Sequence, residues 1–75
     1  MKIVANDYEA NEIIKIIREW TEMTQQQFGE TIHRSQATVQ SMETKRVNVY
    51  LHTLLELANQ FGITITLEKK DNKKK

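Results

Sequence analysis

The strongest constraint on the fold is the spacing of apolar residues over positions 51–61. Five of them recur every three or four residues, the period of one face of an α-helix: Leu51, Leu54, Leu55, Ala58 and Phe61. Gly62 follows directly, and glycine is typical of the position just after the last helical residue. The sequence therefore predicts a helix that ends before Gly62.

After Gly62 the spacing of the apolar residues changes from three or four residues to two. Ile63, Ile65 and Leu67 alternate with polar residues, which is typical of a half-buried β-strand. An unpaired strand would leave its backbone N–H and C=O groups without partners. We therefore expect this strand to pair with the short apolar segment 2–5, with a second chain, or with both.

Three further helices are predicted before residue 51, the second and third of them short, each from a capping residue and an apolar face. The N-cap candidates are Asn6 or Asp7 (with Glu9 in the capping-box position) for a helix to about Trp20, Thr24 (with Gln27) for a second helix, and Ser35 for a third over 36–44. The first helix carries a surplus apolar stripe of Ile13, Ile16 and Trp20 beside the stripe that a core requires. This surplus favours contact with a second chain.

Length and composition exclude several classes of protein. The 75 residues allow one domain, which we assign to 1–68, followed by a disordered Lys-rich tail over 69–75. No Cys is present, and His33 and His52 stand 19 residues apart, so neither a disulfide framework nor a metal site is expected. The apolar runs are too short for a membrane span or a signal peptide. We expect a soluble cytoplasmic protein without a cofactor.

One stretch of the chain matches a known motif. Residues 23–43 read MTQQQFGETIHRSQATVQSME, which resembles the helix-turn-helix of the phage-repressor-like (Xre) family. Eleven positions keep the family's pattern: Met23, Thr24, Gln25, Phe28, Gly29, Ile32, Ser35, Thr38, Val39, Met42 and Glu43. The resemblance covers about residues 10–63. It implies an all-α, lambda-repressor-like bundle of four helices that binds DNA, here with the predicted strand added after the fourth helix.

The third predicted helix has an outward face suited to reading DNA. Val39 and Met42 are its inward residues, so Gln36, Ala37, Gln40 and Ser41 face outward, where the resemblance implies contacts with base edges. A Gln amide can pair bidentately with adenine, and an Ala methyl can contact the thymine methyl. The alternative is that these are ordinary solvated helix residues.

The resemblance also implies phosphate contacts, at the start of the second predicted helix and at the two ends of the third. The candidates are Gln25, Arg34, Ser35, Thr38, Thr44, Lys45 and Arg46. For Lys45 and Arg46 the alternative is a solvated loop. The family normally has Gly at the position of His33, because the backbone turns left-handed there, and His is among the few other residues that tolerate this conformation.

The strand after Gly62 resembles the layout of antitoxin repressors from high-persistence-type toxin–antitoxin systems, in which the strands of two subunits pair. That resemblance implies a homodimer interface built from Ile13, Ile16, Trp20, Leu57, Ile63, Ile65 and Leu67. We expect a dimeric, sequence-specific repressor of its own operon or of a mobile element, bound to an inverted-repeat operator in double-stranded DNA. The alternative is an antitoxin-like inhibitor that binds a partner protein, with or without DNA autoregulation. We do not expect an enzyme, because the sequence contains no arrangement of a nucleophile and a base that would indicate catalysis.

Overall fold

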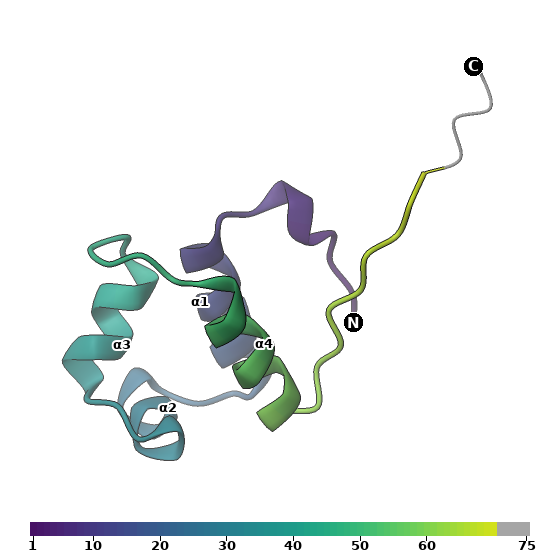
Figure 1. The fold of residues 1–75 in the computed structure, drawn as a ribbon. Coiled ribbons are helices and arrows are strands. Elements are labelled where there is room, and N and C mark those ends of the chain that lie inside the picture. The colour runs from purple at the N-terminus through teal and green to yellow at the C-terminus, as the bar shows by residue number, and fades with distance from the viewer. Residues whose placement is uncertain (71–75) are drawn as a thin grey trace.

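The computed structural model describes residues 1–70, which form a small bundle of four α-helices (Figure 1). The helices are α1 (Ala10–Trp20), α2 (Gln25–Ile32), α3 (Gln36–Glu43) and α4 (Leu51–Gln60), preceded by a single 3-10 turn, η1 (Ala5–Asp7). Helix α2 packs against α3, and α1 packs against both α3 and α4. This arrangement confirms the predicted all-α bundle.

The starts of α2 and α3 are fixed by the predicted capping residues. Thr24 Oγ1 accepts from the Gln27 N–H at 3.1 Å, and Gln27 Oε1 accepts from the Thr24 N–H at 2.9 Å. Ser35 Oγ accepts from the Thr38 N–H at 3.0 Å. Each such cap is worth about 1 kcal/mol, which matters for helices of only eight residues.

Helix α1 begins later than predicted, and the prediction of Asn6 or Asp7 as its N-cap is wrong. Both residues lie in η1, after which the backbone is extended at Tyr8. Glu9 is the N-cap and forms a capping box with Glu12, whose Oε1 accepts from the Glu9 N–H at 2.8 Å. The start of α1 therefore presents the Glu9 carboxylate.

The core lies where the four helices meet. Its fully buried side chains are Ile14, Ile17, Phe28 and Val39, and Met42, Leu54, Leu57 and Ala58 complete it. The ring of Phe28 stacks on that of Phe61 with centroids 5.3 Å apart. Leu57, which we expected at a dimer interface, is only 6% exposed and belongs to this core. Leu57 can therefore contribute to a dimer interface only indirectly, by packing under the residues that form the surface.

The apolar face of α4 is wider than the face that the bundle buries. Leu54 and Ala58 point inward as predicted, whereas Leu51 and Leu55 are 64% and 41% exposed. The buried face is therefore rotated toward Leu57, and it leaves two leucines on the surface.

The strand predicted over 63–67 is not formed in the single chain. Among residues 1–70 no strand is present, and none of their backbone hydrogen bonds joins this segment to residues 2–5. Residues 63–70 leave the end of α4 as an irregular segment (Figure 1). Ile63 and Ile65 still pack against the core, while Leu67 is exposed. The alternation of apolar and polar residues therefore reflects burial of one side of the segment. No strand forms, because no neighbouring strand supplies ladder hydrogen bonds.

The tail assignment is only partly covered by the structure. Residues 69 and 70 have no regular structure, and the disorder predicted for 71–75 lies outside the described residues. None of the helices within 1–70 is long and apolar enough to cross a membrane.

Candidate nucleic-acid interface

The turn between α2 and α3 sets the position of α3. His33 has φ 63° and ψ 42°, so the left-handed conformation predicted at this residue is confirmed. The Arg34 N–H donates to Gly29 O at 2.8 Å. A Cβ at residue 29 would stand 2.6 Å from the Arg34 carbonyl oxygen, so only glycine allows the turn to lie this close to α2.

Helix α3 has distinct inner and outer faces. Val39 is fully buried and Met42 is 8% exposed, which confirms the predicted inward residues. On the opposite side Gln36, Ala37 and Gln40 are exposed, and Ser41 is half-buried. We call these four residues the recognition face. It consists of two amides, a methyl group and a hydroxyl, and it carries no charge.

A partly buried ion pair fixes the last residue of α3 to α1. Arg18 Nε lies 2.6 Å from Glu43 Oε2, and Arg18 Nη2 donates to Glu43 Oε1 at 3.0 Å. The Glu43 side chain is only 3% exposed, and that of Arg18 is 15% exposed. Hydrogen bonding to Glu43 raises the pKa of Arg18. The bidentate geometry holds both the position and the rotation of α3.

The same carboxylate also binds the first residue of α2. Gln25 Nε2 donates to Glu43 Oε1 at 3.2 Å, and Arg18 Nη1 donates to Met23 O at 3.0 Å. Gln25, a predicted phosphate contact, is therefore placed beside the end of α3, and its amide group donates one hydrogen bond to Glu43. Sequence reasoning missed this cluster. A signal was present, because Glu43 stands four residues after Val39 on the inward side of the helix.

The connection from α3 to α4 carries three predicted phosphate contacts: Thr44, Lys45 and Arg46. All three residues are exposed. The Asn11 amide of α1 clamps this connection by donating to Met42 O at 2.7 Å and to Val47 O at 3.1 Å. Sequence reasoning gave no role to Asn11.

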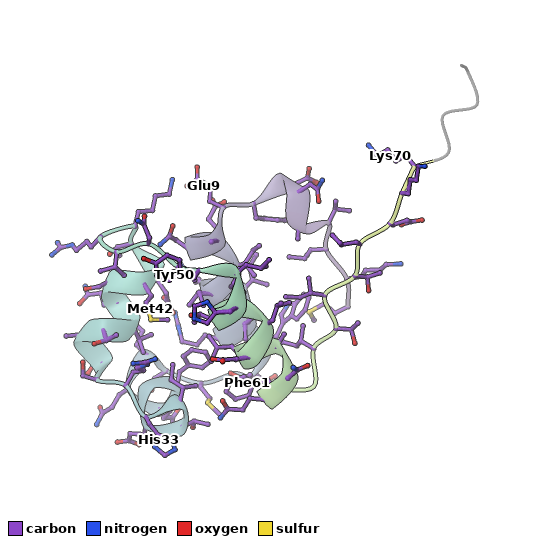
Figure 2. All side chains as sticks on the ribbon, viewed as in Figure 1. Glu9, His33, Met42, Tyr50, Phe61 and Lys70 are labelled. Atoms are coloured by element: carbon purple, nitrogen blue, oxygen red, sulfur yellow. The ribbon has the colours of Figure 1, made fainter. Side chains whose placement is uncertain are left out.

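Lys45 has a partner that the sequence did not indicate. Its Nζ lies 2.6 Å from Glu9 Oε1, and this contact raises the pKa of Lys45. Figure 2 shows Glu9 at the start of α1, on the side of the α3–α4 connection. Of the basic side chains in this connection, Arg46 remains without an ion pair among the described residues.

Comparison with known proteins decides the family. A family model described as helix-turn-helix matches residues 14–67 of the chain. The chain belongs to the phage-repressor-like (Xre) helix-turn-helix family. Helix-turn-helix domains of this family bind DNA and regulate transcription. Comparison with curated proteins and with solved structures found no match.

In this helix-turn-helix the predicted contacts fall into two groups around the recognition face. Arg34, Ser35 and Thr38 lie at the start of α3 and are exposed. Ser35 Oγ donates to Thr38 Oγ1 at 2.9 Å, so the two hydroxyls already serve the cap. The second group, at the end of α3, contains Gln25, Thr44, Lys45 and Arg46. The structure thus brings together all the sequence-predicted DNA contacts along one short helix and its two ends.

A cleft of about 280 Å³ lies beside α3. It runs between the end of α2, the inner edge of α3, residues 47–49 and α4, and its walls include Arg34, Thr38, Met42, Asn48 and Glu56. Within residues 1–70, no three His, Cys, Asp or Glu side chains converge where they could hold a metal ion.

Proposed function

We propose that this chain is a sequence-specific transcriptional repressor that binds an inverted-repeat operator as a homodimer, and that it controls its own operon or a mobile element. The observation that carries the proposal is the recognition face. Helix α3 is anchored through Val39, Met42 and the buried Glu43, so its outer amides are held on a rigid element. Rigid presentation reduces the entropic cost of ordering them against DNA.

The chemistry of this face suits the major groove. Gln36 and Gln40 each offer an amide that can pair with adenine N6 and N7, and Ala37 offers a methyl group for thymine. Without charges on the face, its contacts discriminate by hydrogen-bond pattern and shape. The cations stand at the ends, where Arg34 and Arg46 are exposed and can neutralise phosphates.

The dimer is supported by apolar surface that one chain leaves uncovered. A chain of this length buries only about 60% of its unfolded surface, so additional burial in a second copy is favourable. Ile16 and Trp20 on α1 are half-buried, and Leu67 is 97% exposed. We propose that residues 63–67 pair with their counterpart in a second chain, which would supply the missing ladder hydrogen bonds.

A two-fold dimer places two copies of α3 in successive major grooves on one side of the duplex. The half-site centres then lie about 10–10.5 bp apart. Selection of bound sequences from random duplex DNA tests this directly, with light scattering on the same sample to measure the mass. We expect one enriched inverted repeat and a mass of about two chains. Enrichment of sites without two-fold symmetry, or no enrichment at all, would contradict the proposal.

A further inference from the structure

The contact between Lys45 and Glu9 lies at the edge of the proposed DNA-binding surface. The two side chains are 56% and 62% exposed, and their charged atoms are 2.6 Å apart. Lys45 belongs to the α3–α4 connection, whereas Glu9 begins α1, thirty-six residues earlier. A predicted phosphate ligand is thus already paired with a carboxylate of its own chain.

The backbone around Lys45 is held on both sides, so only its side chain is free to choose a partner. The Arg46 N–H donates to Ser41 O at 3.1 Å, and Asn11 donates to Met42 O and Val47 O. Lys45 itself has φ 68°, a left-handed conformation that these contacts maintain. A change of partner therefore requires rotation of side chains and no change in the backbone of this connection.

The backbone of Glu9 is held at the start of α1. Glu9 is the N-cap of α1, and its own N–H is bound to Glu12 Oε1. The Glu9 carboxylate and a DNA phosphate are both anions that a single ammonium group can neutralise.

We propose that Glu9 sets the DNA affinity of this chain by competing with a backbone phosphate for the Lys45 ammonium. The inference rests on the proposed function, because it assumes that Lys45 contacts DNA. Wild-type chain must give up the Glu9 contact before Lys45 can bind phosphate, and the affinity for every DNA sequence is lowered by the same factor. Exposed ion pairs are weak, so this factor is about two- to fivefold.

Glu9→Gln is the central variant, because glutamine removes the charge and keeps an oxygen that can accept at the start of α1. Asp7→Asn is the matched control. It removes one negative charge two residues away, and Asp7 has no ion pair among the described residues. Lys45→Ala and the double variant Glu9→Gln/Lys45→Ala complete a mutant cycle.

Dissociation constants are measured at about 0.1 M salt, where charges more than about 10 Å apart are largely screened. The probes are the selected duplex and a random duplex.

We expect Glu9→Gln to bind both duplexes about two- to fivefold more tightly than Asp7→Asn does. In the Lys45→Ala background the same substitution should have no effect beyond that of Asp7→Asn. Thermal melting checks the fold, and if glutamine weakens the cap, Glu9→Ser repeats the test with a favoured N-cap residue that carries no charge.

Two results would overturn the inference, and they are distinguishable from failure of the proposed function. If Lys45→Ala weakens binding while Glu9→Gln matches Asp7→Asn or binds less tightly, Glu9 does not compete, but the DNA-binding function stands. If Lys45→Ala leaves the affinity unchanged, Lys45 is not a phosphate ligand and the inference fails with that contact. If the wild-type chain binds neither duplex, the proposed function itself fails.

Discussion

Removal of either partner of the Arg18–Glu43 pair should destabilise the fold, by different amounts. Arg18→Met leaves the Glu43 carboxylate, 3% exposed, with Gln25 as its remaining side-chain donor. Breaking a buried pair in this way costs about 3–5 kcal/mol, and the partial exposure of Arg18 places our expectation at about 3 kcal/mol. Glu43→Met should cost less, about 2 kcal/mol, because Arg18 keeps its bond to Met23 O and reaches water.

The double variant Arg18→Met/Glu43→Met separates pairing from packing. An apolar replacement of a buried ion pair is often neutral, so we expect it within about 1 kcal/mol of wild type. Urea unfolding measures all four free energies of unfolding, and an unchanged m value shows that the denatured state is comparable. Total stability for 75 residues is about 4–11 kcal/mol, so each single loss is easily measured. A double variant as unstable as the sum of the single variants would refute the coupling that we infer.

Three further predictions concern the turn and the second chain. Gly29→Ala should lower the free energy of unfolding by about 1–3 kcal/mol in spite of alanine's higher helix propensity, because its Cβ meets Arg34 O; a thermal melt at or above that of wild type would be inconsistent with this contact. His33→Gly should raise stability by about 0.5–1 kcal/mol, since glycine adopts φ 63° without strain; urea unfolding that shows a loss would contradict a strained turn. Ile65→Asp should reduce the mass in light scattering to that of one chain and abolish binding to the inverted repeat, and a dimer that persists would remove residues 63–67 from the interface.

Local chemistry made the starts of α2 and α3 predictable. The hydroxyls of Thr24 and Ser35 bind N–H groups three residues later, so the signal lies within four residues of sequence. At α1 the same reasoning failed, because three polar candidates (Asn6, Asp7 and Glu9) precede the apolar face, and packing against the core decides which of them becomes the cap. Asn6 and Asp7 were taken up by η1 instead.

The apolar pattern alone could not define the burial of α4 or the state of residues 63–67. The apolar stripe of α4 is broader than its contact with the bundle, so the sequence did not show which edge, Leu51 or Leu57, would be covered. The apolar residues Ile63 and Ile65 indicate that one side of the segment is buried. A β-strand also needs a neighbouring strand to form hydrogen bonds with its backbone N–H and C=O groups.

Contacts between distant residues account for the rest of the site. The resemblance pointed to the residues of α3 and its ends, but no local pattern linked Arg18 to Glu43, Asn11 to Met42, or Glu9 to Lys45. These pairs are separated by 25, 31 and 36 residues, and only the packing of α1 against α3 brings them together.

The central claim is that the outer face of α3 reads base sequence, and Gln36→Ala tests it most directly. Affinities of wild type, Gln36→Ala and Arg46→Ala are compared on the selected site, on its single-base variants and on random DNA. Loss of a bidentate base contact should cost about 1–3 kcal/mol on the selected site and relax preference at one position of each half-site. Arg46→Ala should weaken binding to all sequences alike and reduce the salt slope by about one. If Gln36→Ala instead lowers affinity for selected and random DNA by the same factor, α3 does not read the sequence through this residue.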